Sequence, residues 1–152
     1  MYIPILVALV AGGLLGFFYR RHQLRRESER IHISVPELQE RIARKEPLTI
    51  IDLRHPLDVL ASPQLIPGAM PISPQDIDNR VSDISRNASV VLYCTCPNEE
   101  TSLKASRQMK DRGFRHLKVL TGGLPAWKQA HLPLQDLYPE LEQQVRQRAH
   151  AS

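Results

Sequence analysis

The strongest fold signal in the chain is the segment Ser89-Val90-Val91-Leu92-Tyr93-Cys94-Thr95-Cys96-Pro97-Asn98-Glu99-Glu100-Thr101-Ser102. Its first five residues are mostly β-branched or aromatic, which predicts a short buried strand. Both cysteines of the chain follow directly, and a helix is predicted from Thr101 to Arg112, where Gly113 ends it. The segment therefore predicts a strand, a cysteine-containing loop and a helix in immediate succession.

Strands and helices also alternate on both sides of this segment. Ser34-Val35-Pro36-Glu37 is a capping box that opens a helix to about Lys45, with Leu38, Ile42 and Ala43 facing inward. Further elements are expected as a strand at 48–52, a short helix at 57–61, a short strand at 70–72, a helix from the cap at 73–76 to about 84, a strand at 117–120, a short helix after Gly122-Gly123, and a polar helix at 136–148. This alternation predicts an α/β fold with a mostly parallel central sheet and helices on both faces. The carboxyl ends of such strands are the usual working site.

Residues 1–19 carry no charged side chain and are long enough to cross a bilayer as a helix. We expect them to form a transmembrane anchor followed by a basic juxtamembrane linker at 20–30. All five flanking arginines follow the apolar run, so the positive-inside rule places the C-terminal domain in the cytoplasm of a single-pass membrane protein. The alternative is a cleaved signal peptide. It is disfavoured because no basic residue precedes the apolar run and the small residues Ala11-Gly12-Gly13 lie inside it.

Length and charge limit the remaining classes. The 152 residues allow one domain, expected at 31–134, with a polar helix and tail at 135–152. The net charge of +4 comes almost entirely from the 20–30 segment, which contributes +3, so nucleic acid is not expected as a partner. Two cysteines one residue apart build neither a disulfide framework nor a four-ligand zinc site. No metal or organic cofactor is expected.

A cysteine between a strand and a helix N-terminus is a candidate nucleophile. Unpaired N–H groups and the positive end of the helix dipole stabilise a thiolate and lower its pKa. N–H groups that converge in a short loop also bind an anion such as a persulfide. A buried structural cysteine is the alternative interpretation for either thiol.

Several motifs together extend this hypothesis. They are, in chain order, Ile33-Ser34-Val35-Pro36-Glu37-Leu38, Ile51-Asp52-Leu53-Arg54, Ile66-Pro67-Gly68-Ala69, Val91-Leu92-Tyr93-Cys94, Gly113-Phe114 and Gly122-Gly123-Leu124-Pro125-Ala126-Trp127. Through their order and spacing the chain resembles the single-domain rhodanese family of sulfurtransferases, from about Ile31 to Leu134. The resemblance implies that a cysteine takes up a sulfane sulfur as a persulfide and passes it to a nucleophile, which is covalent catalysis by an activated thiolate.

The resemblance leaves two cysteines for this role. The strand pattern favours Cys94, whereas counting back from Gly113 makes Cys96 the first residue of the six-residue loop typical of sulfur-transferring members. We favour Cys96 because thiolate stabilisation depends on position relative to the helix. Cys94 is then either inert or able to resolve the persulfide as a disulfide. A seven-residue phosphatase loop counted from Cys94 ends at Glu100 instead of arginine, which argues against phosphatase activity.

The other candidate site residues follow from the same resemblance. The substrate-binding residues are expected to be Pro97, Asn98, Glu99, Glu100, Thr101, Ser102 and Arg54. Asp52 matches the acid of the family's acid-x-arginine motif, and ion pairing or loop capping is the favoured role for both members of that motif. Trp127 is expected to be a structural core residue near the site. The loop departs from the family pattern in its two glutamates, which would raise the cysteine pKa if they faced the thiol.

The leading interpretation is thus a membrane-anchored sulfurtransferase. Its expected partners are the lipid bilayer, a small sulfane-sulfur donor or a persulfidated protein, and a protein acceptor. Two alternatives stay open: a catalytically weak rhodanese-like module that binds a protein, and a thiol redox protein that uses Cys94 and Cys96. A disulfide across a single residue would be strained, which counts against the redox alternative.

Overall fold

The computed structural model describes residues 12–20, 31–82 and 84–140. The chain divides into two compact units, residues 1–32 and 33–152. Residues 12–20 of the first unit are helical. Within the described residues no helix is both long enough and apolar enough to cross a bilayer. Residues 1–11 of the expected anchor and residues 21–30 of the expected linker lie outside the described ranges.

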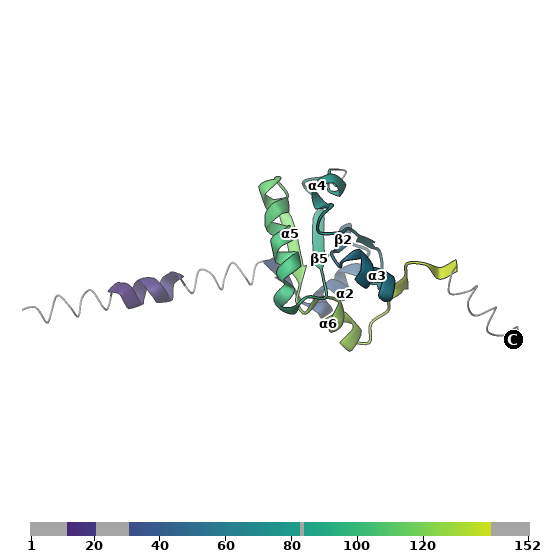
Figure 1. Ribbon diagram of the computed structural model, residues 1–152. Helices are drawn as coiled ribbons and strands as arrows, with labels where there is room; N and C mark the ends of the chain where they lie inside the picture. The colour runs from purple at the N-terminus through teal and green to yellow at the C-terminus, as the bar shows by residue number, and fades with distance from the viewer. Residues whose placement is uncertain (1–11, 21–30, 83, 141–152) are drawn as a thin grey trace, which may run out of the picture. The chain divides into compact units, whose positions relative to one another are not determined.

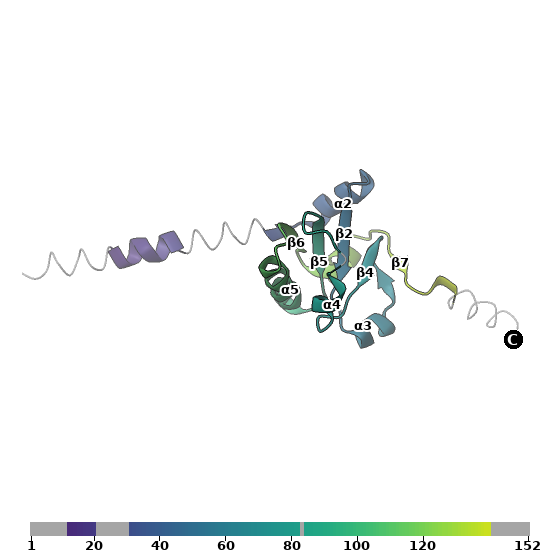
Figure 2. The ribbon, with the colours of Figure 1, turned by 90° about the horizontal axis from the view of Figure 1, so that it is seen from above.

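A five-stranded sheet lies at the centre of the second unit, in the order β1-β6-β5-β2-β4 (Figures 1 and 2). The strands are β1 (His32–Ile33), β2 (Leu48–Asp52), β4 (Ala69–Pro71), β5 (Ser89–Tyr93) and β6 (His116–Leu120). The pairs β2/β4, β2/β5 and β5/β6 are all parallel. The predicted α/β fold with a mostly parallel sheet is confirmed. The predicted strands at 48–52 and 117–120 and the strand from Ser89 are confirmed as well.

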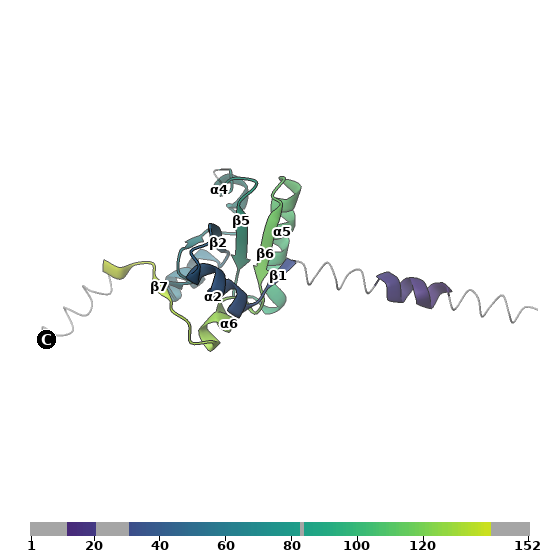
Figure 3. The same cartoon turned by 180° about the vertical axis from the view of Figure 1, so that it is seen from behind.

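Helices cover both faces of this sheet. They are α2 (Val35–Ala43), α3 (Pro56–Ala61), α4 (Ile77–Arg80), the 3-10 turn η1 (Pro97–Glu99), α5 (Glu100–Asp111) and α6 (Gly123–Gln129). Helix α5 lies in front of β6 and beside β5 in Figure 1, and α2 and α6 lie on the opposite face, which Figure 3 shows from behind. Because side chains alternate along β5, Val91 and Tyr93 pack with Leu38 and Trp127 in one buried cluster.

Helix α2 begins where its cap predicts. Ser34 is the N-cap, and its hydroxyl accepts a hydrogen bond from the Glu37 N–H at 3.3 Å. Leu38 is fully buried and Ile42 partly buried, as expected, but Ala43 is exposed because it lies in the last turn. The start of the helix could be predicted because its cap is a local interaction.

Two sequence predictions were wrong in extent. The helix expected from the 73–76 cap to about residue 84 is only the four-residue α4, with Asp76 at its N-cap. At the C-terminus, Gln135–Asp136 form strand β7 instead of the first turn of a helix, and β7 pairs antiparallel with β3 (Gln64–Leu65). This small second sheet joins residues 70 and 72 positions apart, so no local pattern indicates it. Residues 139–140 are helical, and Pro139 is the residue expected in the first turn of the C-terminal helix. Residues 141–152 lie outside the described ranges.

Candidate functional site

The loop between β5 and α5 carries both cysteines. Cys96 has an extended backbone and lies directly before η1, and α5 begins at Glu100 after a kink at Asn98 and Glu99. The Thr101 N–H points to the Cys96 sulfur at an N···Sγ distance of 3.4 Å. An N–H donor in the first turn of a helix stabilises a thiolate over a thiol. Cys96 therefore occupies the position that the helix-terminus argument requires.

The backbone of this loop is unusual at two residues. Asn98 and Glu99 adopt left-handed conformations, with φ of 54° and 50°. For residues other than glycine this region costs about 1–2 kcal/mol each. The Glu99 carboxylate accepts a hydrogen bond from the Gly122 N–H at 2.5 Å, at the N-terminus of α6. That contact directs the Glu99 carboxylate toward α6, and Glu100 is exposed at the start of α5.

The two cysteines differ in burial and in acidity. Cys94 is 3% exposed, and burial raises the pKa of its thiol, as does its hydrogen bond to Cys96. Partial burial also raises the pKa of Cys96. Hydrogen bonds from the Cys94 side chain and from the Thr101 hydroxyl and N–H outweigh that effect, so the net pKa of Cys96 lies below the ordinary thiol value. The hydrogen bond from Cys94 thus favours the thiolate form of Cys96.

Helix α6 holds Cys94 from the other side. The Leu124 N–H donates to the Cys94 carbonyl oxygen at 3.1 Å. A Cβ atom on Gly123 would lie 2.1 Å from that oxygen, so only glycine allows the two backbones to approach this closely. The Gly122-Gly123 turn thus fixes the end of β5 beneath the cysteine loop.

A buried ion pair lies at the end of the neighbouring strand β2. The Arg54 Nη2 atom is 2.7 Å from Asp52 Oδ2, and the two side chains are 1% and 0% exposed. The Arg54 guanidinium also donates to the Ser62 and Gln64 carbonyl oxygens at 2.9 and 3.0 Å. The Tyr93 hydroxyl donates to Asp52 at 3.0 Å, and burial and Asp52 raise the pKa of Tyr93 above its usual value. This network holds the segment between β2 and β3 against the carboxyl end of β2.

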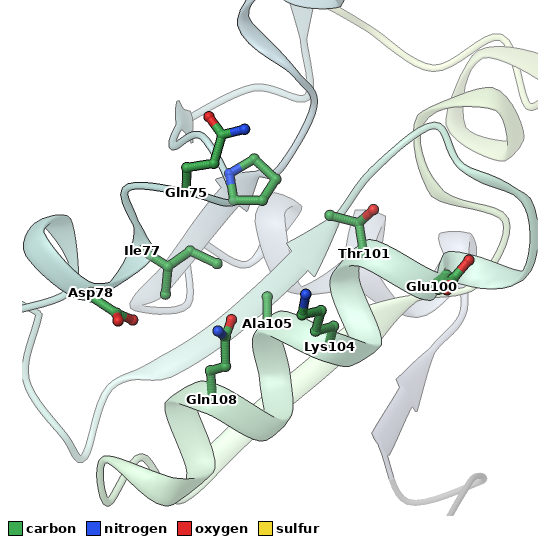
Figure 4. Close-up of a pocket in the computed structure, with 9 residues that line it drawn as sticks. Gln75, Ile77, Asp78, Glu100, Thr101, Lys104, Ala105 and Gln108 are labelled. Carbon is green, nitrogen blue, oxygen red and sulfur yellow. The ribbon is translucent and has the colours of Figure 1, made fainter.

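A groove of about 530 Å³ runs along α5 next to the cysteine loop (Figure 4). Its lining residues are Pro74, Gln75, Ile77, Asp78, Glu100, Thr101, Lys104, Ala105 and Gln108. Cys96 is not among them, but Thr101 belongs both to the groove and to the surroundings of the Cys96 sulfur. Among the described residues, no cluster of three or more histidine, cysteine or acidic side chains could hold a metal ion.

Comparison with known proteins agrees with this architecture. Residues 34–130 match the rhodanese-like domain. The chain belongs to the rhodanese-like family. A sulfurtransferase of Allochromatium vinosum is 28% identical over 102 residues, which cover 67% of this chain and 92% of that protein. An uncharacterized protein of Synechocystis is 28% identical over 101 residues, covering 64% of this chain and 52% of that one.

Solved structures show the same fold. The Alr3790 protein of Anabaena superposes with a TM-score of 0.62 at 26% identity, over 75% of this chain and 90% of that one. A protein from Lactobacillus plantarum superposes with a TM-score of 0.69 over 78% and 98% of the two chains. Its identity of 20% supports the fold alone.

The rhodanese-like domain brings most of the predicted site residues together. Cys94 and the segment from Cys96 to Thr101 form one loop and helix start, whereas Ser102 is fully buried beneath it. Within the described part of the chain, the Ser102 hydroxyl is a buried side-chain oxygen that makes no hydrogen bond of ordinary geometry. It lies close enough to Cys94 to lower the pKa of that thiol. Ser102 therefore adjoins Cys94.

Two further predictions concern structural residues. Trp127 is 2% exposed in the core, where its indole N–H donates to the Pro133 carbonyl oxygen at 2.9 Å. Arg54 is a predicted substrate-binding residue for which ion pairing is the favoured role. Its guanidinium is buried against Asp52 and two carbonyl oxygens, and its contact with a substrate stays a prediction.

Sequence reasoning missed the groove and the role of Tyr93. Lys104 and Gln108 follow Glu100 at four-residue spacing, so their common face of α5 was readable from the sequence. That Gln75 lies across from them was not, because residues 74–78 approach α5 only in the folded chain (Figure 4). Tyr93 was identified only as part of an apolar strand.

Proposed function

We propose that the protein is a sulfurtransferase that carries sulfane sulfur as a persulfide on Cys96. The observation that supports this most directly is the Cys96 thiol itself. It is partly exposed, 3.4 Å from the Thr101 N–H, and its pKa is lowered by hydrogen bonds from Cys94 and Thr101 that outweigh its burial. A partly exposed thiol whose thiolate form is stabilised by hydrogen-bond donors meets the chemical requirement for a nucleophilic cysteine.

In the proposed reaction the Cys96 thiolate attacks the outer sulfur of a sulfane donor. With thiosulfate, a new bond forms between the two sulfurs, the bond between the donor's sulfurs breaks, and sulfite leaves with the electron pair. The negative charge stays on the outer sulfur of the persulfide, next to the N–H groups at the start of α5. An acceptor thiolate then attacks that outer sulfur and releases the Cys96 thiolate. The donor is a small sulfane compound or a persulfidated protein.

The test is mass spectrometry of the full chain in detergent after exposure to thiosulfate or another sulfane donor. Intact mass reports whether one sulfur atom is added, and peptide mapping reports where. We expect the sulfur on Cys96 in the wild type and in Cys94→Ser, and none in Cys96→Ser. The Cys96→Ser variant should lose at least about 100-fold in activity, as is usual when the nucleophile of covalent catalysis is removed.

Other results would assign the protein differently. Addition that persists in Cys96→Ser and is lost in Cys94→Ser would make Cys94 the nucleophile. A Cys94–Cys96 disulfide without an intermediate persulfide would indicate the redox function. No sulfur added by any donor, with both thiols intact, would refute the sulfurtransferase and favour a protein-binding module.

We also propose that residues 1–19 anchor the domain to a membrane, with the domain in the cytoplasm. Support comes from the uncharged sequence of this segment, the arginines that follow it, and the exposed apolar side chains of Leu14, Leu15, Phe17 and Phe18 in its described part. Full-length protein should stay in the membrane fraction through alkaline carbonate washing, whereas a variant lacking residues 2–19 should not. Release of the full-length protein by that wash would refute the anchor.

A further inference from the structure

The groove along α5 begins at the cysteine loop and leads away from it. Thr101 lies at its start, Lys104 one turn along α5 and Gln108 a second turn along, while Gln75 and Ile77 lie across from them (Figure 4). The rise from Thr101 to Lys104 is about 4.5 Å at 1.5 Å per residue, which is within the length of a small molecule. A ligand held by Lys104 can therefore reach the residue that contacts the Cys96 sulfur.

Two opposite charges line this groove without pairing. Glu100 and Lys104 are four residues apart on α5, the spacing at which such side chains usually form an ion pair. Within the described residues neither makes a salt bridge or a side-chain hydrogen bond. Asp78, the other acid of the groove, is paired with Arg112 at 2.6 Å. The groove thus offers one cation and one anion to a ligand.

The amide side chains of Gln75 and Gln108 add donors and acceptors to these charges, and Ile77 and Ala105 add apolar surface. A cavity of about 530 Å³ is within the ordinary size range of small-ligand sites. A dianion such as thiosulfate would meet Glu100 as well as Lys104. A ligand with a carboxylate and a separate ammonium group would complement both.

We propose that this groove binds the sulfur acceptor, and that the acceptor is an amino-acid-type thiol, such as free cysteine or a short cysteine-containing peptide. Lys104 pairs with its carboxylate and Glu100 with its ammonium group. This inference rests on the proposed function, because it assumes a Cys96 persulfide. The acceptor thiolate attacks the outer sulfur, the bond to Cys96 breaks, and the products are the acceptor persulfide and the Cys96 thiolate.

Four probe thiols distinguish the contribution of the carboxylate from that of the ammonium group. Free cysteine has both groups, 3-mercaptopropionate only the carboxylate, cysteamine only the ammonium group, and 2-mercaptoethanol neither. The full chain in detergent is loaded with sulfur and freed of donor, and kcat/KM for discharge is measured with each thiol. Each value is divided by that for 2-mercaptoethanol with the same variant, which removes changes in the reactivity of Cys96.

The variants are Lys104→Gln and Glu100→Gln, with Arg107→Gln as the matched control. Arg107 is an exposed cation on α5 that does not line the groove. Lys104→Gln should lower the ratio about tenfold for cysteine and 3-mercaptopropionate but not for cysteamine, which corresponds to about 1.4 kcal/mol of binding. Glu100→Gln should lower it for cysteine and cysteamine but not for 3-mercaptopropionate. Arg107→Gln should leave every ratio unchanged.

Two outcomes would overturn the inference, and they differ from failure of the proposed function. If the protein loads with sulfur but Lys104→Gln changes no ratio, the groove does not bind the acceptor carboxylate. If Arg107→Gln lowers the ratios as much as Lys104→Gln, the effect is one of net charge and not of the groove. Failure of the proposed function appears earlier, as a protein that never acquires a sulfur atom.

Discussion

The ends of strands β2 and β5 lie side by side, with Asp52 opposite Tyr93 in the parallel register. The polar residues at these two ends nevertheless differ in burial and in pairing. Both lead into polar residues at the carboxyl edge of the sheet, where function is expected. After β2, Asp52 and Arg54 are buried and paired with each other. After β5, Cys96 is partly exposed and its thiol is acidified by neighbouring donors.

This difference shows that location at the carboxyl edge does not by itself identify a functional residue. The buried charges near β2 have their partners within the chain, because unpaired buried charges would cost several kcal/mol. The donors near Cys96 converge on a sulfur that a substrate can approach. Burial and internal pairing, more than position, distinguish the paired residues at the end of β2 from the candidate nucleophile after β5.

The largest effect on this contrast is expected from Arg54→Met, which leaves the Asp52 carboxylate buried without its partner. The free energy of unfolding should fall by about 3–5 kcal/mol, the range for breaking a buried ion pair. The matched control is Arg44→Met, which removes an exposed pair with Glu40 and should cost about 1 kcal/mol or less. Urea denaturation measures both variants. Equal losses would mean that the β2 end is not the structural one.

A smaller loss in the free energy of unfolding is expected from Tyr93→Phe, because the Tyr93 hydroxyl connects the two strand ends. The variant removes the hydrogen bond to Asp52 and the one accepted from the Ile66 N–H, at a cost of about 1–3 kcal/mol. Because burial and Asp52 raise the pKa of Tyr93, the stabilising contribution of the neutral phenol is complete below the unfolded-state pKa of about 10 and is lost as the pH rises above it.

Denaturation curves at neutral pH and at successive alkaline pH values test this prediction. The difference in stability between wild type and Tyr93→Phe should shrink above about pH 10, because only the wild type has this phenol to ionise. A difference that is constant with pH would show that the Tyr93 hydroxyl contributes nothing through its protonation.

The smallest effect is expected from Cys94→Ala, which concerns the cysteine loop alone. Without the donating Cys94 thiol the pKa of Cys96 should rise, so less thiolate is present at pH 7. Alkylation of Cys96 by iodoacetamide should slow about twofold to tenfold, the range for one hydrogen bond of 0.5–1.5 kcal/mol. Cys94→Ser keeps a donor and should slow it less. If the pH dependence of alkylation is the same in Cys94→Ala as in the wild type, the Thr101 donors alone lower the pKa of Cys96.

Much of this architecture could be predicted because its signals are local. The buried strand before the cysteines, the cap at Ser34 and the Gly122-Gly123 turn each depend on a few neighbouring residues, and the structure contains all three. The length of α4 and the strand at Gln135–Asp136 could not be predicted, because α4 is a single turn and Gln135–Asp136 pair with a strand about 70 residues earlier.

The candidate site shows the same difference between features set by local sequence and features set by long-range contacts. The amino-acid sequence alone indicated the rhodanese-like family, the cysteine loop and the preference for Cys96, because a thiol at a helix start is defined by residues adjacent in the chain. It could not show that Glu99 turns toward Gly122, that Arg54 is enclosed by Ser62 and Gln64, or that Gln75 lies across a groove from Lys104. Those facts depend on contacts between distant segments, whose geometry is set by how the whole sheet and its helices pack together.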